Sequence, residues 1–282
     1  MHLIRYDYAV DLFTSVMKPS LLVLFNSGSE NFWGRMKISS RANDFALIGV
    51  QMPMMSHIDG SPENPLMFLV LNLDMKMLSE ILATMPKTPP QQPQYQAYYS
   101  DGIAYGKLNV TLISHLIKLF EEIKETDSHN LVPPALLDLY KHLLQIPEGA
   151  ILRSMVSQKN YAPSVTNSIN YLTEKYNEDF TVETLAEVAD MPTTTFHRYF
   201  KAMTSLSPMQ YVKAIRLFEA RRLMIYNARS AVDACQSVGY ESASQFSREY
   251  KRAFARPPQQ DVSFTINYTP PTFQPFAVKG AS

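Results

Sequence analysis

The chain has 282 residues, which is long enough for two domains that each bury a core of their own. Hydrophobic residues make up 46% and charged residues 18%, as in a globular protein, and the net charge of zero excludes a uniformly basic nucleic-acid-binding surface. The single cysteine, Cys235, excludes an internal disulfide framework and a cysteine-rich metal site. The sequence begins without the pattern of a signal peptide and has no apolar stretch of membrane-spanning length, so we expect a cytoplasmic protein without membrane contact.

The N-terminal part of the chain carries a β-strand pattern. Short apolar runs separated by turn-forming clusters fall at residues 21–25, 32–38, 45–51 and 66–73. Strands at this spacing predict a sandwich or a small barrel.

Helices are predicted to follow these strands. Asp74 is a good N-cap for a helix through about residue 85, and the proline-rich stretch 86–94 predicts a loop. Further helices are predicted at 110–124, at 133–144 and from 147 to about 157. The helix at 110–124 has two apolar sides, as expected if it packs on its own domain and on a partner subunit, so we expect a homodimer. The domain boundary is expected at 158–164.

The C-terminal third carries one pattern twice. Residues 185–208 and 234–258 each read as a short apolar helix, a tight turn, a second helix and a closing proline. The second halves are offset by 50 residues, so that Phe196 recurs as Phe246 and Pro208 as Pro258, while the first halves are offset by 49. Two helix-turn-helix units joined by a long helix are typical of a protein that reads two successive turns of DNA.

The first predicted unit begins with a scaffold helix that has an apolar stripe over 165–176. Thr181 is placed to cap the next helix, and Asp190 supplies the turn. The first recognition helix is predicted from about 193 to 203, with Phe196, Tyr199 and Phe200 on its buried side. A connecting helix then runs from Pro208 to about residue 226.

The second predicted unit begins at Ser230, which caps its first helix with Asp233 in a variant capping box. Gly239 allows the positive φ of the turn. The second recognition helix is predicted from about 242 to 254, with Phe246 and Tyr250 facing the core.

Charge in this region is unevenly distributed. Between residues 196 and 256 there are eleven basic and four acidic residues, a local net charge of +7, whereas residues 174–190 are acidic. Arginine bonds guanine and glutamine bonds adenine in the major groove, so exposed side chains of the recognition helices are the candidates for base contacts. These candidates are Thr194, His197, Arg198, Ser244, Gln245 and Arg248. The candidates for phosphate contacts are Lys201, Lys213, Arg216, Lys251 and Arg252.

At these residues the chain resembles the AraC/XylS family of bacterial transcription regulators, over roughly 165–262. The resemblance rests on Leu185-Ala186, Phe196-x-Arg198-x-Phe200-Lys201, Ser207-Pro208, Ala220-Arg221-Arg222-Leu223, Gly239-Tyr240 and Phe246-Ser247-Arg248-x-Tyr250-Lys251. In that family the exposed residues of both recognition helices touch bases, which supports the six candidates. The chain departs from the family pattern at Asp190, at Pro192 in place of a capping serine, and at Ala255.

The N-terminal half is similar to the family's subgroup with an AraC-type N-terminal domain. The similar segments are 18–21, 47–50, 61–65, 73–74 and 147–149. The resemblance implies an α+β protein: an N-terminal cupin-like β-barrel with flanking helices, used for effector sensing and dimerisation, and an all-α C-terminal domain with two helix-turn-helix units.

A cupin-like barrel also raises the alternative of an enzyme, since metal-dependent cupins hold several histidines and a carboxylate inside the barrel. His57 is the only histidine between residues 3 and 114, and no HxH, HExxH or GxSxG motif occurs. We therefore expect no catalytic residue, metal or cofactor. A group of aromatic and methionine residues either lines a ligand pocket or forms ordinary core: Phe25, Phe32, Trp33, Met36, Met52, Met54, Met55 and Met67.

The sequence thus predicts a sequence-specific DNA-binding transcription regulator. Residues 1–157 are expected to form the effector-sensing and dimerisation domain, 165–262 the DNA-binding domain and 263–282 a disordered tail. The expected partners are operator DNA, an unidentified small effector and a second copy of the chain. The alternatives are a cupin-like enzyme fused to a DNA-binding module and a DNA-binding regulator that has no effector.

Overall fold

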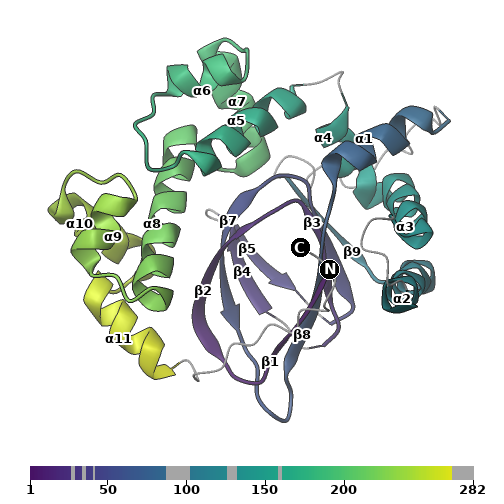
Figure 1. Cartoon of the computed structure of the whole chain (residues 1–282), viewed down its shortest axis with the longest axis horizontal. Coiled ribbons are helices and arrows are strands. Elements are labelled where there is room, and N and C mark those ends of the chain that lie inside the picture. The colour runs from purple at the N-terminus through teal and green to yellow at the C-terminus, as the bar shows by residue number, and fades with distance from the viewer. Residues whose placement is uncertain are drawn as a thin grey trace.

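The computed structural model describes residues 1–26, 29–33, 36–40, 42–86, 102–125, 132–157 and 161–268, and shows a sheet region flanked by helices on two sides (Figure 1). The strands form two antiparallel sheets. The five-stranded sheet has the order β1-β8-β3-β6-β9: β1 His2–Tyr6, β8 Leu66–Asn72, β3 Ser20–Leu24, β6 Asp44–Ile48 and β9 Ile103–Lys107. The four-stranded sheet has the order β2-β7-β4-β5: β2 Val10–Met17, β7 Met52–Ile58, β4 Ser29–Trp33 and β5 Met36–Ser40.

Three of the four predicted strands are confirmed, as β3, β6 and β8. The prediction of one strand over 32–38 is wrong, because Trp33 of β4 is the register partner of Met36 of β5 and the chain reverses between them. In the sequence, the glycine at position 34 could have signalled an interruption of the predicted strand. Strand β7 also escaped prediction, since it contains Pro53 and the polar Ser56, which interrupt the strand pattern.

Residues of both sheets line one cavity, so the two sheets face each other. Among the described residues, every strand pair joins strands of the same sheet. The structure therefore shows a mixed fold with an N-terminal sheet region, and the closed barrel implied by the resemblance is not shown by these pairs.

The helices predicted after the strands are confirmed. They are α1 Met75–Thr84, α2 Val110–Glu125, α3 Pro134–Gln145, a 3-10 turn at Pro147–Gly149 and α4 Ala150–Val156. Asp74 caps α1 by accepting a hydrogen bond from the backbone N–H of Met77 at 3.0 Å. Of the loop predicted at 86–94, all but residue 86 lies outside the described residues.

Seven further helices follow in the C-terminal region. They are α5 Ala162–Glu174, α6 Val182–Val188, α7 Thr193–Thr204, α8 Pro208–Tyr226, α9 Ala231–Ser237, α10 Ala243–Phe254 and α11 Pro258–Tyr268. Helix α11 corrects the predicted tail, because residues 263–268 are helical and only 269–282 lie outside the described residues. In the described part of the chain, no helix is both long and apolar enough to cross a bilayer.

Helix α11 is anchored by a buried ion pair that sequence periodicity does not reveal. Arg221 of α8 donates from Nε to Oδ2 of Asp261 at 2.7 Å, and their side chains are 5% and 1% exposed. The Tyr250 hydroxyl donates to the same oxygen at 2.7 Å, and Arg221 also reaches the Thr265 hydroxyl at 3.0 Å. A carboxylate so deeply buried is tolerated because its partners are fixed around it.

The hydrophobic core divides at a different place from the expected domain boundary. One continuous cluster runs from the sheets through α3 and α4 into α5, α6, α7 and the first half of α8, as far as Ile215. A second cluster starts at Leu217 and contains α9 and α10. The first helix pair, α6–α7, therefore shares the main cluster with the sheet region, whereas the second pair, α9–α10, packs in the second cluster.

Direct contacts explain this shared core. The hydroxyl of the fully buried Tyr211 donates to the carbonyl oxygen of Gln51, next to β7, at 2.6 Å. Gly102, with φ +69°, lies so close to the end of α7 that a Cβ there would come within 2.5 Å of the Met203 carbonyl oxygen. Helix α8 also packs along β2 and β7 (Figure 1).

Candidate DNA-binding interface

The α6–α7 pair is held by local signals that the sequence predicted. The Thr181 hydroxyl accepts from the backbone N–H of Thr184 at 3.2 Å, which caps α6. Asp190 makes the turn with φ 51°, a conformation that aspartate tolerates. Pro192, which stands in place of the family's capping serine, makes no side-chain capping hydrogen bond at the start of α7.

Helix α7 exposes the side that was predicted to meet DNA. Phe196 and Phe200 are fully buried. Tyr199, which was predicted to be buried, is half-buried. Its ring packs on Tyr161 at 4.7 Å between centroids, and the Arg198 guanidinium lies 5.0 Å from its centroid. The four predicted contact residues of this helix are all exposed: Thr194, His197, Arg198 and Lys201.

The α9–α10 pair has the stronger caps of the two. The Ser230 hydroxyl accepts from the N–H of Asp233 at 3.1 Å, and Ser242 caps α10 by accepting from the N–H of Gln245 at 3.3 Å. Gly239 has φ +80°, as predicted, and a Cβ there would come within 2.4 Å of the Asn177 carbonyl oxygen. Glycine is therefore required both by the turn and by the loop packed against it.

Helix α10 also exposes its predicted contact residues. Phe246 and Tyr250 are buried, whereas Ser244, Gln245, Arg248, Lys251 and Arg252 are exposed. Two candidates share one partner that the sequence analysis did not single out: Glu249 accepts hydrogen bonds from Lys213 at 2.8 Å and from Gln245 at 3.3 Å. The i, i+4 spacing of Gln245 and Glu249 was an available signal, but the approach of Lys213 from α8 was not.

Arg216, a predicted phosphate contact, is bonded to three backbone carbonyl oxygens of the protein. Its guanidinium donates to the carbonyl oxygens of Tyr176 at 2.7 Å, Glu178 at 2.6 Å and Gly239 at 2.9 Å. The first two acceptors precede α6, and the third lies in the turn between α9 and α10. Arg216 therefore ties the two helix pairs together, and the prediction of a phosphate contact is corrected, since its donors point at backbone carbonyls.

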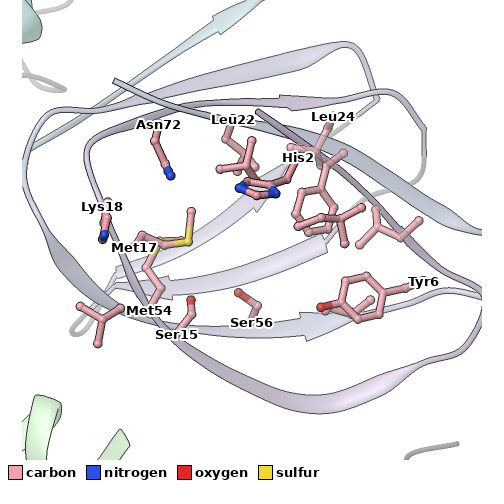
Figure 2. Close-up of a pocket in the computed structure, with 16 residues that line it drawn as sticks. His2, Tyr6, Ser15, Met17, Lys18, Leu22, Leu24, Met54, Ser56 and Asn72 are labelled. Carbon is pink, nitrogen blue, oxygen red and sulfur yellow. The ribbon is translucent and has the colours of Figure 1, made fainter. Parts of the chain in front are cut away.

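A second candidate site lies inside the sheet region. A cavity of about 330 Å³ is lined by side chains from both sheets, within the range of small-ligand pockets. Figure 2 shows Lys18 and Asn72 toward one end, Tyr6 toward the other, and Ser15 and Ser56 along one wall. The remaining lining is apolar except for His2: Ile4, Val16, Met17, Leu22, Leu24, Met54, Ile58, Leu66, Phe68 and Val70.

The residues that the sequence offered as pocket candidates lie in different surroundings, because neighbouring residues of a strand face opposite sides of the sheet. Met54 lines the cavity, and Met55 packs against the second helical cluster. Met52 is buried in the main cluster, and Phe25 is 42% exposed. Met67 is half-buried outside the cavity lining, and the side chains of Phe32, Trp33 and Met36 lie outside the described residues.

Replacing Arg216 tests its role as a tie. We expect Arg216→Gln to lower the free energy of unfolding by about 2 kcal/mol or more, because three carbonyl oxygens lose a charged donor. Arg222→Gln on the same helix is the matched control, since Arg222 is exposed and pairs with Glu219, and it should cost less than about 1 kcal/mol. Urea unfolding measures both. If the two variants are equally stable, and if DNA binding by Arg216→Gln depends less on salt, then Arg216 contacts a phosphate as the sequence predicted.

Known proteins resemble both halves of this chain. The transcriptional activator RhaS of Enterobacter sp. (strain 638) is 25% identical over 182 residues, which cover 64% of this chain and 63% of RhaS. RhaS of Yersinia pestis (strain Pestoides F) is 30% identical over 91 residues, which cover 32% of this chain and 33% of RhaS. The chain thus spans less than two thirds of the length of these relatives.

Solved structures show the same fold over nearly the whole chain. Apo ToxT from Vibrio cholerae strain SCE256 superposes with a TM-score of 0.57 at 11% identity, covering 94% of this chain and 97% of ToxT. ToxT from that strain with a bound unsaturated fatty acid gives a TM-score of 0.54 at 10% identity, covering 93% and 95%.

Two family models match the chain. A helix-turn-helix domain matches residues 185–262, and the AraC-type transcriptional regulator N-terminus matches residues 1–151, which is more than half of the chain. The chain therefore belongs to the AraC family of transcriptional regulators.

Proposed function

We propose that this protein is a sequence-specific DNA-binding transcription regulator of the cytoplasm, in which residues 165–262 bind the operator and residues 1–157 sense an effector. The observation that carries the proposal is the pair of helices α7 and α10, each with an aromatic buried side and a polar, cationic exposed side. In this proposal α6–α7 and α9–α10 are both helix-turn-helix units, and they enter successive major grooves about 34 Å apart.

Six exposed side chains are proposed to read bases. They are Thr194, His197 and Arg198 on α7, and Ser244, Gln245 and Arg248 on α10. Four lysine and arginine side chains are proposed to contact phosphates, and each neutralised phosphate steepens the salt dependence of binding. These are Lys201, Lys213, Lys251 and Arg252.

Replacement of the two arginines tests the base contacts. Arg198→Ala and Arg248→Ala should each weaken operator binding by about 1–3 kcal/mol and relax specificity at one position, because a bidentate contact to guanine is lost. Lys251→Ala, on the same helix as Arg248, should weaken binding to all sequences alike. It should also reduce the slope of the logarithm of the binding constant against the logarithm of the salt concentration by about one. Selection from random duplexes, followed by fluorescence anisotropy, measures these effects. Wild-type affinity and specificity in both arginine variants would refute the assignment.

The cavity between the sheets is the proposed effector site. The ligand-bound ToxT structure contains an unsaturated fatty acid, and the cavity here offers matching chemistry: a long apolar lining, with the cation Lys18 and the amide of Asn72 at one end. The described residues that line it include no carboxylate. We propose an apolar effector with a carboxylate that lies beside Lys18. The cupin-like barrel of the family would then be the pair of sheets that enclose this site.

Removing the cation tests this effector class. Palmitoleate should raise the midpoint of thermal unfolding of the wild type, because a ligand that binds only the folded state stabilises it. Lys18→Met should weaken binding about tenfold or more, since a charge-assisted hydrogen bond is lost. Methyl palmitoleate, which lacks the charge, should bind both proteins with the same lower affinity. Equal binding of the acid by wild type and variant would place the carboxylate elsewhere.

Thermal unfolding with ligands, together with assays of metal binding and turnover, decides between the proposal and its two alternatives. An effector-independent regulator would give no thermal shift with any small molecule. A cupin-like enzyme would bind a metal and turn over a substrate. The cavity lining contains one histidine, His2, which is a poor match to the several histidines and carboxylate of metal-dependent cupins.

Helix α2 is the proposed dimer contact. Its inner side packs on α3, while the outer side exposes an apolar stripe at i, i+3, i+7 and i+10: Val110 is 80%, Ile113 41%, Ile117 54% and Phe120 46% exposed. We propose that a second copy of the chain covers this stripe, in agreement with the two apolar sides seen in the sequence.

A charge in the stripe tests the dimer. Ile117→Glu should shift the protein toward monomer, because burial of an unpaired carboxylate in an apolar contact costs several kcal/mol. Thr111→Glu, on the flank of the same helix, should leave the association unchanged. Sedimentation velocity over a range of concentrations measures both. A wild type that is monomeric at all concentrations, or an Ile117→Glu variant that dimerises as well as the wild type, would contradict the proposal.

A further inference from the structure

Glu249 is an acidic residue in the middle of the cationic helix α10. Its side chain is 17% exposed, and both carboxylate oxygens are bonded. Oε1 accepts from Lys213 Nζ at 2.8 Å and from Gln245 Nε2 at 3.3 Å, and Oε2 accepts from the Tyr240 hydroxyl at 2.8 Å. A carboxylate this near the proposed DNA-facing side repels phosphates unless a cation offsets it, and Lys213 supplies that cation.

The carboxylate is held from outside its own helix. Lys213 comes from α8, and Tyr240 comes from the turn that precedes α10. Burial acts to raise the pKa of Glu249, but the hydrogen bonds from Lys213, Tyr240 and Gln245 outweigh it, so that the pKa lies below its ordinary value. Glu249 is therefore ionised at neutral pH, and an ionised carboxylate accepts hydrogen bonds without donating any.

This restriction fixes the orientation of the Gln245 amide. Because Glu249 only accepts, the amide must turn its NH₂ group toward the carboxylate, and the flipped amide would set Oε1 against Oε1. The carbonyl oxygen and the second N–H of Gln245 are then left on the exposed side in one fixed order. That donor and acceptor pair matches adenine, which offers the N6 amino group and the N7 acceptor in the major groove, whereas guanine offers two acceptors.

We propose that Glu249 is a positioning residue for DNA recognition, which makes Gln245 selective for adenine by holding its amide in one orientation. The proposal rests on the proposed base contact of Gln245. Lys213 and Tyr240 hold Glu249 in place, and Lys213 also offsets its charge toward the DNA backbone. The recognition element of the second helix pair is thus the unit Gln245–Glu249–Lys213, with side chains from two helices.

The experiment compares base preferences at every operator position for four proteins: the wild type, Gln245→Ala, Glu249→Gln and the control Glu219→Gln. Glu219 lies on α8 and pairs with the exposed Arg222, so its replacement neutralises an acid outside the unit. Selected random duplexes identify the operator, and competition anisotropy with single-base variants gives the preferences. The same four proteins are checked by circular dichroism and thermal unfolding.

We expect the wild type and Glu219→Gln to prefer adenine about tenfold at one position, and Gln245→Ala to lose that preference. Glu249→Gln should reduce it to less than about threefold at the same position and leave the others unchanged, because a neutral amide can donate or accept and releases the orientation of Gln245. If Glu249→Gln keeps the adenine preference of the wild type, or loses base preference equally at all positions, the proposal is overturned. The base contact of Gln245 is then unaffected. No change at any position in Gln245→Ala overturns the base contact itself, and the proposal with it.

Should Glu249→Gln not fold, Glu249→Asp serves the same purpose. It keeps the charge and withdraws the carboxylate by one methylene group, so the bond to Gln245 is lost. The same loss of adenine preference is expected, and a retained preference overturns the proposal.

Discussion

Helix α8 uses three polar side chains to bond three different parts of the protein, and the rest of the architecture depends on these bonds. At intervals of five residues it places Tyr211, Arg216 and Arg221. Tyr211 bonds the carbonyl of Gln51 beside the sheets, Arg216 bonds carbonyls from both helix pairs, and Arg221 bonds Asp261 of α11. Each group would cost free energy if left unpaired. The three contacts therefore fix the positions of the sheets, the two helix pairs and α11 along helix α8.

This arrangement gives the two helix pairs unequal surroundings. The α6–α7 pair is continuous with the core of the sheet region, whereas α9–α10 has a separate core and reaches the sheets through Met55. The strand that carries Met55 also carries Met54, which lines the cavity. Strands β2 and β7 thus lie between the cavity on one side and α8 on the other (Figures 1 and 2).

The charge on the proposed DNA-facing side depends on which basic residues are paired inside the protein, and the net charge of the chain, which is zero, does not reveal it. Of the basic residues of α8, Arg216 and Arg221 are occupied inside the fold, and Arg222 pairs with Glu219. Helices α7 and α10 expose five lysine and arginine side chains, which are Arg198, Lys201, Arg248, Lys251 and Arg252. A count of basic residues therefore overstates the charge that DNA would meet, because part of that charge holds the protein together.

The sequence alone determined the elements whose cause is local. The caps Asp74, Thr181 and Ser230, the turns at Asp190 and Gly239, and the buried side chains of Phe196, Phe200, Phe246 and Tyr250 follow from residue type and helical spacing, and the structure confirms each of them. The repeated pattern also identified which side chains are exposed on both helices. These features involve residues only a few positions apart, so their physics is contained in a short window of sequence.

Tertiary structure alone decided which partners meet across long separations. Arg216 looked like a phosphate contact because an arginine on an exposed helix and one that bonds distant carbonyls have the same local pattern. Glu249 acquired its role only when α8 brought Lys213 to it, 36 positions away in the sequence. The cavity is lined by residues of five strands from two sheets, which lie far apart in the sequence. Periodicity tells which face of an element is apolar, but the partner of a buried polar group is fixed by packing.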